Sequence, residues 1–229
     1  KLDVLDLKAI SKAAQTYKVP FIVDNTVATP FLLNPIEHGA NIVIHSLTKY
    51  IGGNGTSLGG VIIDAGNFDW SNGKFPEFTE PSAGYHGLKY YEVLGAASFI
   101  AKVRIEGLRD LGASLSPFNA FQIIQGLETL AIRIKKHSEN ALELAKWLQK
   151  RPEVAWVNYP GLISSKYYEL AQQYLPEGQS GIVTFGLKGG YEAAKKVADE
   201  TRFFSLLANI GDTKSLIIHP ASTTHQQLS

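Results

Sequence analysis

The chain has no cysteine and no methionine among its 229 residues. Without cysteine it can form neither a disulfide bond nor a thiolate metal site, and this fits a reducing compartment such as the cytoplasm. No uncharged run is long enough to cross a membrane, and the first ten residues lack the apolar core of a signal peptide. We therefore expect a cytoplasmic protein with no membrane partner.

An excess of charge of one sign is missing as well. Lys and Arg number 22 against 21 Asp and Glu, and the charges are dispersed along the chain. Nucleic-acid grooves and membrane-surface patches need clustered basic residues, so we expect no nucleic-acid partner and favour small-molecule chemistry. Because 45% of the residues are hydrophobic, the chain can bury a sizeable core.

The two ends of the chain predict an internal fragment. The sequence has no initiator methionine and stops in the polar stretch HPASTTHQQLS. We therefore expect a piece of a longer protein, some of whose functional residues lie elsewhere.

Helix and strand patterns alternate in the first part of the chain. DLKAISKAAQTYK has apolar residues at helical spacing. Three short β-branched and apolar runs follow as strand candidates: VPFIVDNT, NIVIHS and GGVIID. This alternation predicts an α/β fold with a mostly parallel sheet covered on both faces. Ligands of such sheets bind beyond the carboxyl ends of the strands, where Asp24 and Ser46 stand.

Residues 66–90 are rich in glycine, proline and aromatic residues and have no clear period. Long loops inside compact domains are usually functional or disordered, and this one has too many aromatic residues for disorder. We expect an ordered loop that covers the entrance of the active site.

From residue 91 to about 150 the pattern is helical, with a break at GASLSP where Ser116 can cap a helix that begins at Pro117. Strand and helix patterns then mix differently, as in VAWVNYP, SGIVTFGLKG, GYEAAKKVADE and SLLANIG. We place a boundary near Gly126, which gives a larger domain over 1–126 and part of a smaller α+β domain over 127–229.

Lys49 stands in HSLTKYIGGNGTSLGG, just past the predicted strand NIVI. Most lysines are solvated surface residues, but this one has hydroxyl groups at Ser46 and Thr48, glycines after it and no acid nearby. Hydroxyls and free backbone amides at a strand end suit a phosphate. An amine beside such a site can bond covalently to a carbonyl group.

The glycines of this segment could also indicate a nucleotide site. A P-loop needs its lysine after the glycines, and here the lysine precedes them. A dinucleotide fingerprint needs a third glycine where Leu58 stands. Neither pattern is met, although a non-catalytic nucleotide-binding α/β domain stays open as an alternative.

Asp24 ends the strand pattern that precedes the Lys49 strand. An aspartate there commonly caps the next turn. It can also hold the protonated nitrogen of a pyridine ring, which a pyridoxal cofactor needs to accept electrons. Asp24 and Lys49 can end two strands of one sheet and face the same crevice, so the pair is more specific than either residue alone.

Residues 23–60, VDNTVATPFLLNPIEHGANIVIHSLTKYIGGNGTSLGG, resemble the cofactor-lysine signature of the Cys/Met-metabolism family of pyridoxal-phosphate (PLP) enzymes. The resemblance continues through the whole chain, including GLETL and HPASTTH. It implies the aspartate-aminotransferase-like fold (fold type I) and PLP as cofactor. The stretches FPEFTEPSAGYHGLKYYE and LRDLGASLSPFNAF are most similar to family members that act on O-acetylhomoserine.

The resemblance also implies roles for single residues. Lys49 would hold PLP covalently and act as the catalytic base, Asp24 would hold the ring nitrogen, and Ser46 and Thr48 would bind the phosphate. Asn209 would lie near the substrate carboxylate, although a turn-forming role before a glycine is an equal alternative. Other functional residues of the family fall outside this chain, including a tyrosine and an arginine donated by a neighbouring subunit.

The implied reaction is γ-replacement: O-acetyl-L-homoserine loses acetate, and sulfide or a small thiol adds to give homocysteine or its analogue. Cystathionine synthesis and γ-elimination by a methionine or cystathionine γ-lyase are alternatives on the same scaffold. The family further implies a homotetramer whose active sites are shared between subunits. His45 and His219 have no second ligand at metal spacing, so we expect no metal site.

Overall fold

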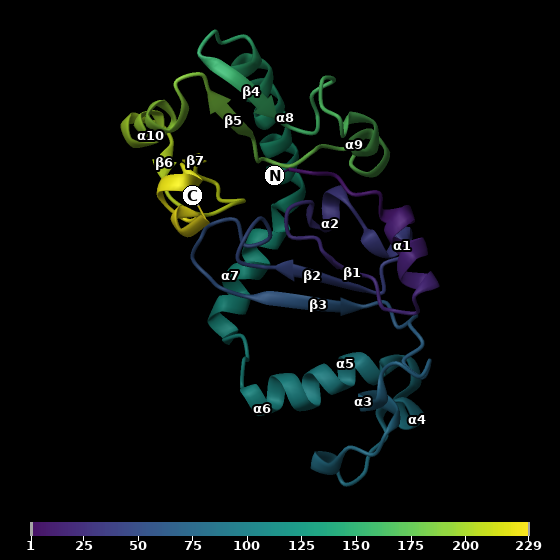
Figure 1. Cartoon of the computed structure of the whole chain (residues 1–229). Coiled ribbons are helices and arrows are strands. Elements are labelled where there is room, and N and C mark those ends of the chain that lie inside the picture. Colours follow the sequence, from purple (N-terminus) through teal and green to yellow (C-terminus); the bar gives the residue numbers. More distant parts are fainter. Residues whose placement is uncertain (1, 229) are drawn as a thin grey trace.

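The structure is a computed structural model that describes residues 2–228, and its central feature is a three-stranded sheet in the order β1-β2-β3. β1 (Ile22–Asp24) runs parallel to β2 (Ile42–Ser46), and β3 (Gly60–Asp64) runs antiparallel to β2. All three strands lie where the sequence predicts them. Figure 1 shows the sheet in the middle of the molecule.

The expectation of a mostly parallel sheet is wrong for β3. No helix separates β2 from β3, and residues 47–59, which we call the Lys49 loop, join them instead. The Leu47 amide donates to the Gly59 carbonyl at 2.9 Å, so the loop closes directly beyond the two strand ends. An antiparallel neighbour needs no crossover helix, and the chain returns as a long hairpin.

Helices precede and separate the first two strands. α1 (Leu7–Thr16) begins at Asp6, whose carboxylate accepts a hydrogen bond from the Ala9 amide at 3.1 Å. α2 (Thr29–Leu32) and the 3₁₀ helix η1 (Pro35–His38) join β1 to β2, and η1 ends at Gly39 with φ of 91°. α1 confirms the helix predicted from DLKAISKAAQTYK.

The two faces of β2 are buried by different parts of the chain, because neighbouring residues of a strand point to opposite faces. Val43 packs with Leu7 of α1 and with Tyr174 from the distant helix α9 (Tyr168–Tyr174). Ile42 packs on the other side with Trp70, in a cluster that also contains Phe78 and Tyr90. The predicted covering of both faces is therefore confirmed for β2.

Residues 66–111 form a compact unit that we call the aromatic lobe. Trp70 is 4% exposed and stacks on Phe99, with ring centroids 5.2 Å apart. The predicted ordered segment is confirmed, because its aromatic rings supply a core of their own. Its helical segments are α3 (Pro76–Thr79), η2 (Ala83–Tyr85), α4 (Tyr90–Leu94), η3 (Gly95–Ala97), α5 (Ser98–Lys102), the π-helix η4 (Val103–Leu108) and α6 (Arg109–Leu111).

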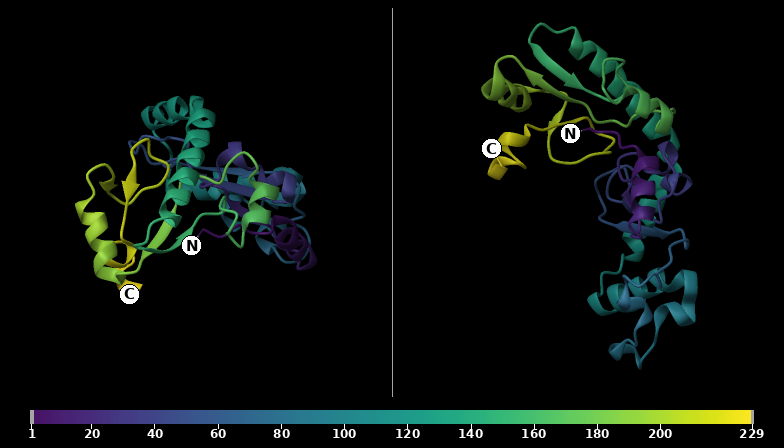
Figure 2. Two further views of the ribbon diagram at one scale, coloured as in Figure 1. Left: turned by 90° about the horizontal axis from the view of Figure 1, so that it is seen from above. Right: turned by 45° about the vertical axis from the view of Figure 1, so that its right-hand side comes forward.

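α7 (Pro117–Glu128) begins as predicted, since the Ser116 hydroxyl accepts a hydrogen bond from the Asn119 amide at 3.1 Å. The helix expected to continue to residue 150 is interrupted at Thr129, after which α8 (Leu130–Gln149) begins. Residues 130–228 form what we call the second region. The right-hand view of Figure 2 shows the aromatic lobe, the sheet and the second region following one another along the molecule.

The second region mixes short sheets with helices, as predicted. β4 (Val154–Asn158) pairs antiparallel with β5 (Thr184–Leu187), and α8 packs Ala141 and Ala145 against Tyr159 and Leu162. The remaining elements are α10 (Gly190–Glu200), the parallel pair β6 (Ser205–Leu206) and β7 (Leu216–Ile217), η5 (Pro220–Ser222) and η6 (Gln226–Leu228). Within residues 2–228, no helix combines the length and the apolar character of a membrane span.

Candidate active site

Lys49 lies three residues beyond the end of β2, in the Lys49 loop, and is half-buried. Its Nζ donates a hydrogen bond to Oδ1 of Asn209, 2.9 Å away, although the two residues are 160 positions apart in sequence. Within residues 2–228, no carboxylate oxygen forms an ion pair with Lys49. A neutral amide orients the amine without placing an opposite charge beside it.

Asp24 is the last residue of β1 and its side chain is exposed. Its Oδ1 accepts a hydrogen bond from the Thr26 amide at 3.0 Å, so the turn-capping role considered for this aspartate is present. Thr26 in turn accepts from the Ser46 amide at 2.8 Å, which ties the turn after β1 to the end of β2. Asp24 and Lys49 thus follow neighbouring parallel strands at the same edge of the sheet.

The two predicted phosphate ligands differ in their surroundings. The Ser46 hydroxyl makes no hydrogen bond within the described part of the chain and can bind an oxygen of a ligand. The Thr48 hydroxyl donates to the Gly59 carbonyl at 3.3 Å and accepts from the Gly59 amide at 3.1 Å. Thr48 therefore closes the Lys49 loop, and its phosphate-binding role stays a prediction, as does that of Ser46.

The Lys49 loop packs tightly against residues 209–213 of the second region. The Thr213 amide donates to the Gly53 carbonyl at 2.8 Å. Gly211 has a φ of +71° and faces the main chain of Tyr50. Tyr50 is 1% exposed, and its hydroxyl accepts from the Gly181 amide at 3.2 Å. These contacts fix the loop that carries the amine.

Two histidines considered as metal ligands occupy other environments. His45 is 2% exposed on β2, and burial lowers its pKa while the negative charge of Asp24 opposes this shift. His219 pairs its Nδ1 with the Ser222 hydroxyl at 2.8 Å. Residues 2–228 contain no cluster of three metal-binding side chains.

The aromatic lobe lies away from Lys49, so the expectation that it covers the entrance to this chain's own site is wrong. Its core packs on one face of β2 through Ile42 and Ile44, whereas Lys49 lies three residues beyond the last residue of that strand. Figures 1 and 2 show the lobe on the side of the sheet opposite the second region. Sequence composition predicted that the lobe is ordered, but it could not show where the lobe lies relative to Lys49.

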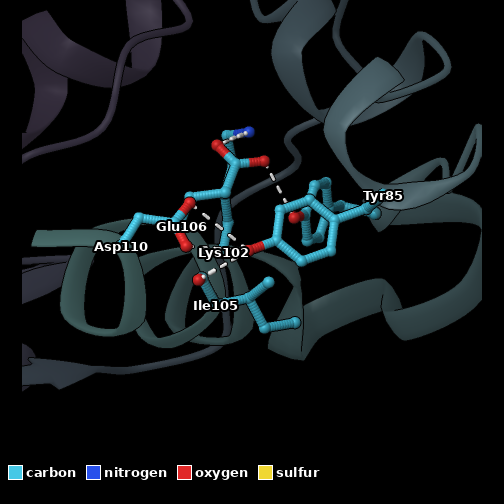
Figure 3. Close-up of polar contacts among 6 residues, drawn as sticks. Tyr85, Lys102, Ile105, Glu106 and Asp110 are labelled. Carbon is cyan, nitrogen blue, oxygen red and sulfur yellow. Dashed lines mark hydrogen bonds and ion pairs between the residues drawn. The ribbon is translucent and has the colours of Figure 1, made fainter.

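A polar network stabilises the lobe around its π-helix. Lys102 Nζ lies 2.6 Å from the Glu106 carboxylate, and Glu106 also accepts from the Tyr90 hydroxyl at 2.8 Å. The Tyr85 hydroxyl donates to the Ile105 carbonyl at 2.8 Å, as Figure 3 shows. Burial, with the Glu106 carboxylate, raises the pKa of Tyr90 to about 12. The charges of Lys102 and Glu106 neutralise each other, which indicates a structural role for this pair.

The residues beyond the strand ends fit a phosphate-bearing carbonyl cofactor. The structure provides an amine without an acid partner, a carboxylate with one free oxygen, a free hydroxyl and a glycine-rich loop. Primary amines bond covalently to carbonyl carbons, and hydroxyls and backbone amides bind phosphate oxygens. Together these groups fit the chemistry that an enzyme of the pyridoxal-phosphate class requires.

All 229 residues match the family described as "Cys/Met metabolism PLP-dependent enzyme", and the chain belongs to this family. It is 58% identical to the O-acetyl-L-homoserine sulfhydrylase of Leptospira meyeri and 50% identical to O-acetyl-L-homoserine sulfhydrylase 1 of Thermus thermophilus. Each alignment covers 100% of this chain and 54% of the relative. The chain therefore spans about half the length of these curated relatives.

A solved structure supports the same assignment. A putative O-acetylhomoserine (thiol)-lyase of Campylobacter jejuni, described as containing pyridoxyl-lysine phosphate, matches with a TM-score of 0.93 and 47% identity. The match covers 98% of this chain and 54% of that one. Because the chain belongs to a PLP-dependent enzyme family, the alternative of a non-catalytic nucleotide-binding domain is wrong.

Proposed function

We propose that the protein to which this chain belongs catalyses γ-replacement on O-acetyl-L-homoserine. The bond from Cγ to the acetate oxygen breaks first, and sulfide or a small thiol then forms a bond to the same carbon, giving acetate and homocysteine, or methionine where the thiol is methanethiol. The observation that carries this proposal is the Lys49 amine beyond β2, which is hydrogen-bonded to the neutral Asn209 and lies at the same sheet edge as the carboxylate that ends β1. The sulfhydrylase names of the relatives at 58% and 50% identity support the choice of substrate.

For the architecture, we propose fold type I with a boundary near Gly126 between the domains 1–126 and 127–229. The TM-score of 0.93 with a solved family member supports the fold. The break between α7 and α8 lies three residues beyond Gly126, at Thr129.

Four residues of this chain would hold PLP. Lys49 would bond covalently to it, Asp24 would accept a hydrogen bond from its protonated ring nitrogen, and Ser46 and Thr48 would contact its phosphate. When bound, PLP supplies an electron-accepting ring that weakens the bonds to hydrogen next to the amino group of the substrate. The negative charge of Asp24 would favour the protonated form of the ring nitrogen, and the positive charge that this gives the ring is what would let it accept electrons.

Lys49 would then act as the mobile proton carrier. γ-Replacement removes a proton from Cα and one from Cβ, and both are returned before the product leaves. A flexible amine can reach both carbons from one side, whereas a short fixed carboxylate cannot easily do so. The Asn209 amide holds this amine at 2.9 Å and can release it without separating two opposite charges. Asn209 would also contact the carboxylate of the substrate.

We further propose that the whole protein is a cytoplasmic homotetramer with active sites completed between subunits. The free apolar face of α7 supports association with another chain or with the rest of the protein. Phe118 is 68% exposed and Phe121 is 58% exposed on this helix, and such a surface is normally covered. Light scattering of the intact protein tests the assembly.

The function is tested by product analysis on the intact protein. With O-acetyl-L-homoserine and sulfide, we expect homocysteine and acetate in equal amounts. Without sulfide, acetate release should be slow. Rapid formation of a keto acid and ammonia without a thiol would assign γ-elimination instead, and a preference for cysteine as acceptor would assign cystathionine synthesis.

A further inference from the structure

Arg133 contacts the main chain directly behind Lys49. This residue lies in the first turn of α8 and is half-buried. Its Nη1 donates to the Tyr50 carbonyl at 2.7 Å, and its Nη2 donates to the Ile51 carbonyl at 3.1 Å and to the Gly126 carbonyl at 2.7 Å. A single guanidinium thus joins the two residues that follow Lys49 to the last turn of α7.

The orientation of this guanidinium is fixed from its own helix. Arg133 Nε donates to the Thr129 hydroxyl at 2.9 Å. Four hydrogen bonds therefore hold the planar group, and every acceptor is an uncharged oxygen. Within residues 2–228, no carboxylate forms an ion pair with Arg133. An arginine whose donors all go to neutral oxygens holds the main chain in place and neutralises no acid.

Glycine at position 126 allows this close approach. A Cβ atom there would clash with the carbonyl oxygens of Gly52 and Ile51. α7 therefore lies directly against the Lys49 loop, and Arg133 reaches across the junction of the two helices. The main chain of the loop has no freedom to move on this side.

We propose that Arg133 is the positioning residue for Lys49, because it fixes the main chain after Lys49 and so presents the amine to the carbonyl carbon of the cofactor. This inference deepens the proposed function and rests on the covalent role of Lys49. A lysine can supply the charge of Arg133 but not its planar fork, so it cannot bind three carbonyl oxygens in this arrangement.

The test compares Arg133→Lys in the intact protein with the matched control Tyr174→Phe. Tyr174 also joins the second region to the first, since its hydroxyl donates to Asp6 at 2.8 Å and accepts from the Lys8 amide at 3.2 Å. It does not contact the Lys49 loop. Both variants lose polar contacts between the second region and the first part of the chain. Only Arg133→Lys loses the contacts with the carbonyls of Tyr50 and Ile51.

Two readouts follow the position of Lys49 without any sulfhydrylase assay. The first is the rate at which the cofactor-free protein forms its covalent bond between PLP and Lys49, which we call cofactor capture. Samples are reduced with borohydride at successive times, and peptide mass spectrometry measures the labelled fraction of the Lys49 peptide. The second is hydrogen exchange at the amides of Gly52 and Gly53, which donate to Leu47 and Lys49 at 2.9 and 2.8 Å. For Arg133→Lys we expect capture at least tenfold slower and exchange at least tenfold faster. Tyr174→Phe should leave both unchanged.

Equal effects of the two variants would overturn the proposal, because Arg133 would then act only on general stability. If Arg133→Lys does not fold, Thr129→Val carries the test. It removes the hydroxyl that accepts from Arg133 Nε and donates to the Gly126 carbonyl at 3.2 Å, and it leaves the three carbonyl contacts of Arg133 possible. We expect a smaller change in the same direction, and no change would overturn the proposal. If the wild-type protein bonds PLP to Lys49 at a normal rate but forms no sulfide-dependent product, the proposed reaction is refuted, whereas the positioning role of Arg133 is not.

Discussion

Gly211 lies against the main chain of Tyr50 so closely that a Cβ atom on Gly211 would come within 2.5 Å of the Tyr50 nitrogen. The contact joins two residues that are far apart in the sequence, and Tyr50 directly follows Lys49. It leaves space only for a hydrogen atom. The backbone of Gly211, with φ of +71°, is also one that side chains rarely adopt.

Gly211→Ala is expected to lower the free energy of unfolding by about 2 to 4 kcal/mol, because left-handed strain and overpacking act together. Gly73→Ala is the matched control, since Gly73 has a φ of +89° and nothing within 4 Å of its added Cβ. It should cost only the strain, about 1 to 2 kcal/mol. Urea unfolding of the intact protein measures both. If the two variants lose the same free energy of unfolding, the main chain around Tyr50 moves to accept the added Cβ atom without a further cost.

Borohydride treatment should fix PLP to the peptide that contains Lys49. Lys49→Ala should abolish this label and lower turnover by at least about 1000-fold, because the proton carrier is lost. Lys89→Ala is the control, since Lys89 is a surface residue that pairs only with Glu92 at 3.4 Å. A label on another lysine in the wild-type protein would contradict the assignment.

Asp24→Asn should retain the cofactor but lower turnover by about 100-fold or more, equivalent to about 2.7 kcal/mol of transition-state stabilisation. The amide keeps the oxygen that accepts from Thr26, at 3.0 Å, so the turn after β1 should survive. What is lost is the negative charge opposite the ring nitrogen. Loss of substrate Cα hydrogen into D₂O measures the affected step, and a near-normal rate would show that another group controls the ring.

His137 provides a prediction about pH. Its ring lies edge-on to Tyr50 at 5.5 Å; burial and the positive charge of Arg133 lower its pKa, whereas Asp212 opposes this. A lowered pKa means that the unfolded chain binds the proton more readily than the folded chain does. His137 therefore opposes folding as the pH falls below about 6.5, by up to about 1.4 kcal/mol per pH unit.

His137→Gln should flatten the fall in stability between about pH 7 and pH 5. Urea unfolding of the cofactor-free wild-type and variant proteins at several pH values gives the difference, in which contributions from other groups cancel. Parallel curves for the two proteins would mean that His137 titrates alike in the folded and unfolded states.

Local sequence signals predicted much of the fold. Ser116 before Pro117 marked the start of α7, because a serine at this position accepts an amide hydrogen bond and proline suits the first turn. Strand β2 was recognisable from its apolar run, and its end placed Lys49 beyond the sheet. Asn209, proposed near the substrate, lies against the Lys49 amine instead of standing apart in a turn.

Other features depend on contacts that no local pattern encodes. Arg133 stands between Leu130 and Ile134 on an amphipathic helix, where it is indistinguishable from a solvated arginine until the carbonyls of Tyr50 and Ile51 meet it. The reversal of β3 depends on how the Lys49 loop closes, and the position of the aromatic lobe depends on that reversal. The domain boundary near Gly126 and the functional roles of Lys49, Asp24, Ser46, Thr48 and Asn209 stay predictions.

The contacts that fix the Lys49 loop also determine when it can form during folding. The partners of this loop lie 83 residues away at Arg133, 131 away at Gly181 and 160 away at Asn209. Contacts of such long sequence separation form slowly, because a large chain loop must close first. On the ribosome, a nascent chain would carry Lys49 without its neighbours until residue 213 has emerged.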